Sequence, residues 1–128
     1  MSDKMMIRAG WALSILYGLF MLGASVMPKF VSDIGSQTLA DLGWPDSPIL
    51  LIGVIELLCT VLYLVPRTGL LGACLSMAVL GGAMVTQIRA GSPLFSHTLF
   101  SLYLGTVMWA GLWLRDPAVR TVWPVRRR

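Results

Sequence analysis

Four long apolar stretches divide the chain, and short segments rich in polar residues, glycine or proline separate them. The stretches cover residues 9–27, 48–65, 69–88 and 94–114. Each is about 20 residues long, so a helix over it would be roughly 30 Å long at 1.5 Å per residue. That length crosses the hydrocarbon core of a bilayer. Isolated strands would leave backbone polar groups unpaired in lipid, so the pattern predicts four transmembrane helices.

The connections between the stretches predict how the helices are arranged. Residues 66–68 and 89–93 are short connections, so the last three helices must run as antiparallel neighbours. Residues 28–47 form the one long loop, in which apolar and polar positions mix as in a partly helical segment at a membrane interface. We therefore expect an all-α protein in which residues 1–128 form a single domain, an up-down bundle of four transmembrane helices.

The composition supports a membrane location. Hydrophobic residues make up 56% of the chain and charged residues only 12%, against about 25% charged residues in a typical soluble domain. A soluble domain of this size has a high ratio of surface to volume and needs more charge to cover it. The composition therefore excludes an ordinary cytosolic enzyme, a disordered protein and a free nucleic-acid-binding domain.

The distribution of basic residues predicts the orientation in the membrane. Of the ten Lys and Arg residues, only Lys29 and Arg89 lie in the connections on one side of the predicted bundle. The others lie in the N-terminal segment, the 66–68 turn and the tail 115–128, which places both termini in the cytoplasm. The tail holds five arginines, for which we expect anionic lipids and not nucleic acid as the partner: Arg115, Arg120, Arg126, Arg127 and Arg128.

Glu56 is the most informative single residue because it lies at the midpoint of the second apolar stretch. An acidic side chain at that depth costs about 2.5–3.5 kcal/mol on insertion scales, which makes it a candidate functional residue. Desolvation disfavours a charge there, so we expect a neutral hydrogen-bond donor unless a cation reaches it. A buried polar contact that only orients the helices is the alternative.

Three further polar residues lie near the outer ends of the predicted helices. Lys29 follows the first stretch, Gln87 is near the end of the third, and His97 is in the first turn of the fourth. Together with Glu56 they could form a ligand-binding funnel that opens outwards, with Glu56 at its floor. The alternative for each is an interfacial side chain that reaches water.

The sequence predicts no metal site and no catalytic set of its own. Cys59 and Cys74 do not form a Cys-x-x-Cys motif, and the chain has one histidine. Small residues recur at helical spacing in the first and third stretches, as in Gly10, Ser14 and Gly72. Such faces let membrane helices approach closely, within the bundle or in a homo-oligomer.

Several short segments, in this order and spacing, resemble the DoxX-like family of small bacterial membrane proteins. They are Met27-Pro28-Lys29, Gly53-Val54-Ile55-Glu56-Leu57, Val65-Pro66-Arg67-Thr68, Gly72-Ala73, Gly82-Ala83 and Arg115-Asp116-Pro117. The resemblance implies a four-helix bundle in the bacterial inner membrane. It also implies that Lys29, Glu56 and Gln87 are the positions of the family's polar pattern.

The resemblance further implies an accessory role beside membrane redox complexes that are linked to quinones or thiols, without independent catalysis. The chain shows no haem, flavin or metal signature, so a partner or a bound quinone would have to carry any electrons. Two other functions remain open from the sequence. One is a non-catalytic scaffold or assembly factor, and the other is a small proton-coupled transporter that uses Glu56.

Overall fold

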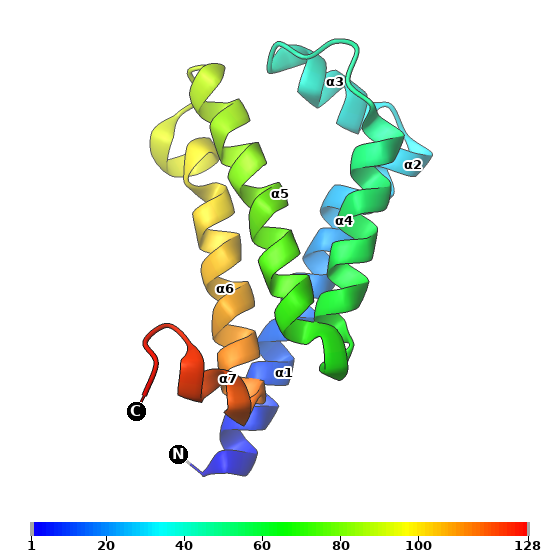
Figure 1. Ribbon diagram of the computed structural model, residues 1–128. Coiled ribbons are helices and arrows are strands. Elements are labelled where there is room, and N and C mark those ends of the chain that lie inside the picture. Colours follow the sequence, from blue (N-terminus) through cyan, green and yellow to red (C-terminus); the bar gives the residue numbers. More distant parts are fainter. Residues whose placement is uncertain (1, 128) are drawn as a thin grey trace.

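The computed structural model describes residues 2–127, which are almost entirely helical and contain no strand. Long helical segments run alternately up and down along one direction (Figure 1). The elements in chain order are α1 (Asp3–Phe20), the π-helical η1 (Met21–Val26), α2 (Met27–Val31), α3 (Ile34–Asp41), α4 (Ile49–Leu64), the 3-10 turn η2 (Pro66–Thr68), α5 (Gly69–Arg89), the π-helical η3 (Leu94–Thr98), α6 (Phe100–Arg115) and α7 (Pro117–Val122). This confirms the predicted all-α class.

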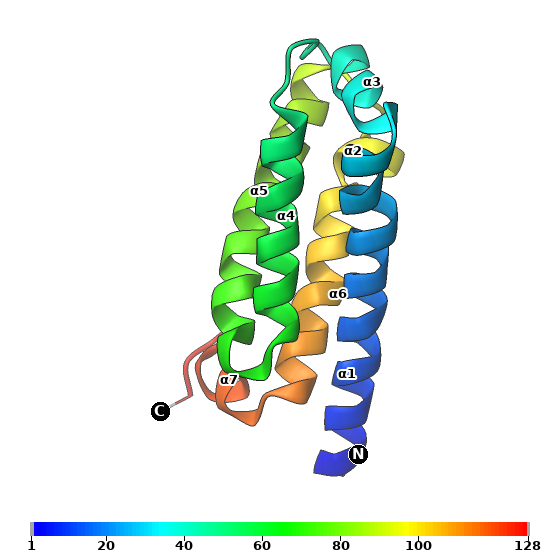
Figure 2. The ribbon, with the colours of Figure 1, turned by 90° about the vertical axis from the view of Figure 1, so that its right-hand side faces the viewer.

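Two layers make up the bundle. Helices α4 and α5 pack against each other in one layer, and α1 packs along α6 in the other (Figure 2). Helix α5 also contacts α6, and η1 contacts α4, which joins the layers. The start of α1, the turn η2 and helix α7 lie at one end, which we call the terminal end (Figure 1). Helix α3 lies at the opposite end, which we call the loop end.

Two helical segments within the described residues are long and apolar enough to cross a membrane. They cover Asp3–Val31 and Pro66–Arg89, and the apolar helix Ile49–Leu64 is shorter. Large apolar side chains are exposed around the outside of the bundle, where water would disfavour them and lipid would not. Examples are Leu16, Leu19, Leu51, Leu58, Leu71, Val85 and Ile88.

The first helical segment is longer than the sequence predicted. It starts at Asp3 and continues past Pro28 to Val31, whereas we expected it to end near Met27. Proline lacks an N–H group, and its ring clashes with the carbonyl of an ordinary preceding α-helical turn. The π-helical stretch η1 changes the hydrogen-bond register first, and the Met27 N–H bonds to the Leu22 carbonyl oxygen, five residues back. The helix therefore continues through the proline.

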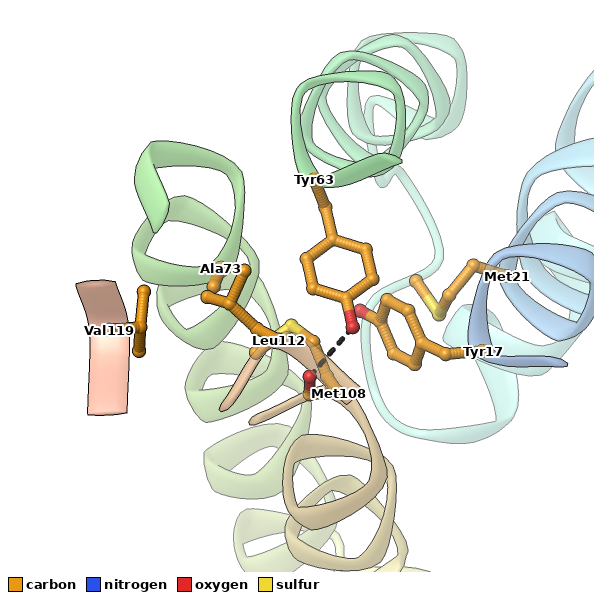
Figure 3. Close-up of a cluster of buried hydrophobic side chains, with 7 residues drawn as sticks. All are labelled: Tyr17, Met21, Tyr63, Ala73, Met108, Leu112 and Val119. Carbon is orange, nitrogen blue, oxygen red and sulfur yellow. Dashed lines mark hydrogen bonds between the residues drawn. The ribbon is translucent and has the colours of Figure 1, made fainter. Parts of the chain in front are cut away.

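The core lies towards the terminal end and is built from Tyr17, Met21, Tyr63, Ala73, Met108, Leu112 and Val119. The rings of Tyr17 and Tyr63 meet edge to face with centroids 5.2 Å apart (Figure 3). The Tyr63 hydroxyl donates to the Met108 carbonyl oxygen at 2.7 Å and lies 3.0 Å from the Ser14 hydroxyl. Gly72 packs directly on the Tyr63 backbone, so the predicted small-residue face serves contacts within the bundle.

The arginines of the tail are not all free to reach lipid. Arg115 is buried, donates to the Tyr63 carbonyl oxygen, and lies 4.3 Å above the ring of Trp11. Arg120 donates to the carbonyl oxygens of Trp113 and Leu114 and pairs with Asp3 at 3.3 Å. The exposed arginines of the described tail are Arg126 and Arg127, and Arg128 lies outside the described residues.

Candidate functional site

A cavity of about 500 Å³ lies at the loop end of the bundle. Helices α4 and α5 form two of its walls, the junction of η1 and α2 forms a third, and α3 with the loop after it covers the cavity. Most of the lining is apolar, as in Ile52, Ile55, Ala83, Leu39 and Trp44. An apolar cavity with a few polar groups is the usual form of a site for a small molecule.

An ion pair between two helices lies at this cavity. The Lys29 Nζ on α2 lies 2.9 Å from the Glu56 Oε2 on α4, and both side chains are almost buried. Lys29 also donates to the Ser25 carbonyl oxygen at 2.8 Å and to its hydroxyl oxygen at 3.0 Å. The Ser25 hydroxyl in turn donates to Glu56 Oε2 at 2.9 Å. All three ammonium protons are therefore used inside the protein.

Local sequence spacing creates this ion pair. Ser25 and Lys29 are four residues apart, so they lie on the same face of the first helical segment. Gly53 lies one turn before Glu56, and a Cβ atom there would meet Lys29 Cβ at 3.3 Å and the Phe30 ring at 3.0 Å. The missing side chain at Gly53 thus lets the lysine chain cross close to α4. Lys29 is the cation that a charged Glu56 requires at this depth.

Two oxygen atoms at the cavity are left without a hydrogen-bond partner among the described residues. The hydrogen bonds to the Glu56 carboxylate go to Oε2, which leaves Oε1 without a donor. The Gln87 Oε1 on α5 is buried and also has no donor. Buried polar atoms are normally hydrogen-bonded, so an orphan atom beside a cavity needs an explanation. The site offers two acceptors to a ligand that can donate.

Three of the four predicted site residues come together, and one does not. Lys29, Glu56 and Gln87 line the same cavity. His97 is exposed on η3, where its Nδ1 lies 2.7 Å from the Ser96 hydroxyl, and it does not line this cavity. Ser25 was not predicted as a partner of Glu56, although its spacing of four residues from Lys29 places both on one helix face.

The remaining candidate chemistry is sparse. Within residues 2–127, no three His, Cys, Asp or Glu side chains are grouped so that they could hold a metal ion. Cys59 is buried, Cys74 is exposed, and both are free thiols. The polar groups at the cavity offer an ion pair and unpartnered hydrogen-bond acceptors.

The fold and the site together define a class: a small helical bundle with an apolar exterior and a polar group of residues facing an apolar cavity. The model of the DoxX-like family matches residues 12–111, which is most of the chain and includes every predicted site residue. The chain belongs to the DoxX-like family, which indicates a membrane protein. The curated proteins and the solved structures gave no match.

Proposed function

We propose that this protein crosses the bacterial inner membrane four times, with both termini in the cytoplasm. The alternating direction of the long helices and their exposed apolar side chains support this topology. The basic residues support the orientation, because most of them lie at the terminal end, which would face the cytoplasm. The cavity then opens near the outer face of the membrane.

In that membrane, the protein serves as an accessory subunit of a redox complex and holds a quinol from the membrane pool. The observation that carries this proposal is the pair of unpartnered acceptors, Glu56 Oε1 and Gln87 Oε1, at one apolar cavity. A quinol has two hydroxyl donors on an apolar ring, which complements this arrangement. The oxidised quinone has only acceptors, so it would leave both of these oxygen atoms without a donor, and the Lys29 protons are already used.

The protein's own role in this proposal is binding. The carboxylate and the amide orient the headgroup, the apolar walls exclude water, and the ion pair with Lys29 keeps the carboxylate in place. Oxidation of the quinol belongs to the partner, because the electron-transfer chemistry needs a redox cofactor there. The proposal favours the accessory function over a scaffold because a scaffold does not require a cavity with unpartnered polar atoms.

Ligand-dependent thermal stability tests this proposal. The purified protein in detergent is heated with a short-chain benzoquinol under anaerobic conditions, and separately with the matching benzoquinone. We expect the quinol to raise the melting temperature, since a ligand at 100 times its Kd stabilises the folded state by about 2.7 kcal/mol. The quinone should raise it less.

The matched variant is Glu56→Gln, which keeps the side-chain size but removes the charged acceptor. It should lose the larger part of the quinol effect. Equal shifts for quinol and quinone, or no shift with either, would count against the proposal. A redox-complex partner is tested separately by crosslinking in native membranes, where its absence would remove the accessory role but not quinol binding.

A further inference from the structure

A second hollow lies away from the cavity at Glu56, near the terminal end of the bundle. It is a groove of about 540 Å³ between α5, α6 and the segment after α7. Its lining is almost entirely apolar and includes Met77, Gly105, Trp109, Trp113 and Trp123. None of these residues lines the cavity at Glu56. The proposed quinol site therefore does not account for this groove.

The tail holds one wall of the groove in a fixed position. The ring of Trp123 stacks on Trp109 with centroids 4.5 Å apart and planes 8° from parallel. The Trp113 Nε1 donates to the Trp123 carbonyl oxygen at 3.1 Å, and the Arg120 Nε donates to the Trp113 carbonyl oxygen at 2.9 Å. These contacts fasten the chain back against α6 and leave the groove open between the helices.

Two arginines without an ion-pair partner among the described residues follow this wall in the chain. Pro124 lines the groove, and the exposed Arg126 and Arg127 come two and three residues later. Neither forms an ion pair among the described residues. At the terminal end, Asp3 pairs with Arg120 and Asp116 accepts the Ala118 N–H, and neither acid pairs with Arg126 or Arg127. The charge is thus available to an anion at the end of an apolar groove.

We propose that this groove is a binding site for one anionic phospholipid, with an acyl chain between α5 and α6 and the phosphate at Arg126 and Arg127. An acyl chain matches the apolar lining, and an anionic headgroup matches the charge beside it. Tryptophan is enriched at the level of lipid headgroups, where this groove would lie. The inference rests on the membrane placement of the proposed function and is independent of quinol binding.

Quenching of tryptophan fluorescence tests the site directly. The full-length protein is reconstituted in phosphatidylcholine vesicles that contain either phosphatidylglycerol or phosphatidylcholine with brominated acyl chains, at the same bromine content. Three tryptophans lie at the groove, so brominated phosphatidylglycerol should quench more strongly and at a lower mole fraction. Equal quenching by the two lipids would overturn the proposal.

Three variants distinguish lipid binding in the groove from general electrostatic attraction of the protein surface to anionic lipid. Arg126→Gln with Arg127→Gln should weaken the preference for phosphatidylglycerol by about 30-fold, since each arginine near the surface contributes about fivefold. Arg8→Gln with Arg67→Gln removes the same amount of charge elsewhere at the terminal end and should leave the preference for phosphatidylglycerol almost unchanged. Ala110 also lines the groove, so Ala110→Leu fills it and should reduce the quenching while the charge stays the same.

The remaining outcomes also decide the matter. An equal loss of lipid preference in the double variant of Arg8 and Arg67 would mean that the preference comes from surface charge alone. Full quenching in Ala110→Leu would mean that the quenching acyl chain does not lie in the groove. Either result overturns the site, as does competition by free inorganic phosphate at millimolar concentration. Protein that fails to enter the vesicles at all would contradict the membrane placement itself, whereas inserted protein without lipid preference would contradict only this site.

Discussion

Both ends of the bundle contain buried polar atoms without a hydrogen-bond partner among the described residues, but only at the loop end does such an atom line a cavity. At the terminal end, the Tyr17 hydroxyl and the Arg115 Nη1 are such atoms, and neither residue lines the cavity at Glu56 or the groove at Trp109. At the loop end, the unpartnered Gln87 Oε1 lines a cavity of about 500 Å³. An unpartnered polar atom therefore indicates a binding site only where a ligand can reach it.

Glycine shows the same contrast along a single helix. A Cβ atom at Gly72, near the terminal end of α5, would run into the Tyr63 backbone. A Cβ atom at Gly82, on the cavity, or at its neighbour Gly81 would meet nothing within 4 Å. The first glycine brings two helices together, whereas the second leaves room between them.

The largest expected effect comes from Gly72→Leu. The added side chain cannot fit because the atoms it meets belong to the backbone of α4 and cannot move independently. We expect a loss of more than about 4 kcal/mol, the range of severe overpacking. Thermal unfolding in detergent measures this loss, with Gly81→Leu as the matched control. Similar melting temperatures for these two variants would mean that the terminal end is not closely packed.

The next largest effect is expected from Lys29→Met. Removing the ammonium leaves the Glu56 carboxylate buried without its cation, and breaking such a pair costs about 3–5 kcal/mol. The double variant Lys29→Met with Glu56→Leu should recover most of the stability, because no unpaired charge remains. Thermal unfolding of both variants checks this, and a double variant as unstable as the single one would contradict it.

A selective loss of binding is expected from Gly82→Leu. The leucine enters the open cavity without meeting the backbone, so quinol stabilisation should disappear while the free energy of unfolding of the ligand-free protein stays within about 0.5 kcal/mol of the wild type. Gly81→Leu adds the same side chain one residue away, where it does not line the cavity. Quinol binding that survives in Gly82→Leu would place the ligand elsewhere.

The smallest expected effect comes from Gln87→Leu. One hydrogen bond to the quinol is lost, which corresponds to about 1 kcal/mol and a roughly fivefold weaker affinity. The free protein should become slightly more stable, because the change removes a buried acceptor without a partner. Titration calorimetry and thermal unfolding measure the two effects, and an unchanged affinity would exclude Gln87 from the site.

Much of the fold could be predicted from the sequence, because lipid-length apolar stretches and short connections leave few arrangements. The candidate role of Glu56 could also be predicted, since an acid at that depth is costly. The course of the chain through Pro28 could not, because the π-helical turn depends on hydrogen bonds that have no residue signature. The position of His97 could not be predicted for a similar reason. The π-helical η3 and the turn at Leu99 change the helix face on which His97 lies.

The burial of Arg115 was also beyond prediction from the sequence. A run of basic residues after an apolar stretch is typical of a lipid-facing tail, and nothing local distinguishes Arg115 from Arg126. Its site exists only because Gly69 and Trp11, far apart in the chain, meet at the terminal end and leave a slot for the guanidinium. Such contacts between distant segments require the assembled bundle.

The π-helical turn η1 has a consequence for how this site can change over time. It shifts the phase of everything that follows it, and one residue corresponds to about 100° around a helix axis. A deletion of Leu22 or Gly23 that retains the π-helical turn would keep every side chain that lines the cavity, yet it would turn Ser25 and Lys29 away from α4. The pairing of lysine and glutamate is thus encoded in the spacing of the chain as well as in its residues.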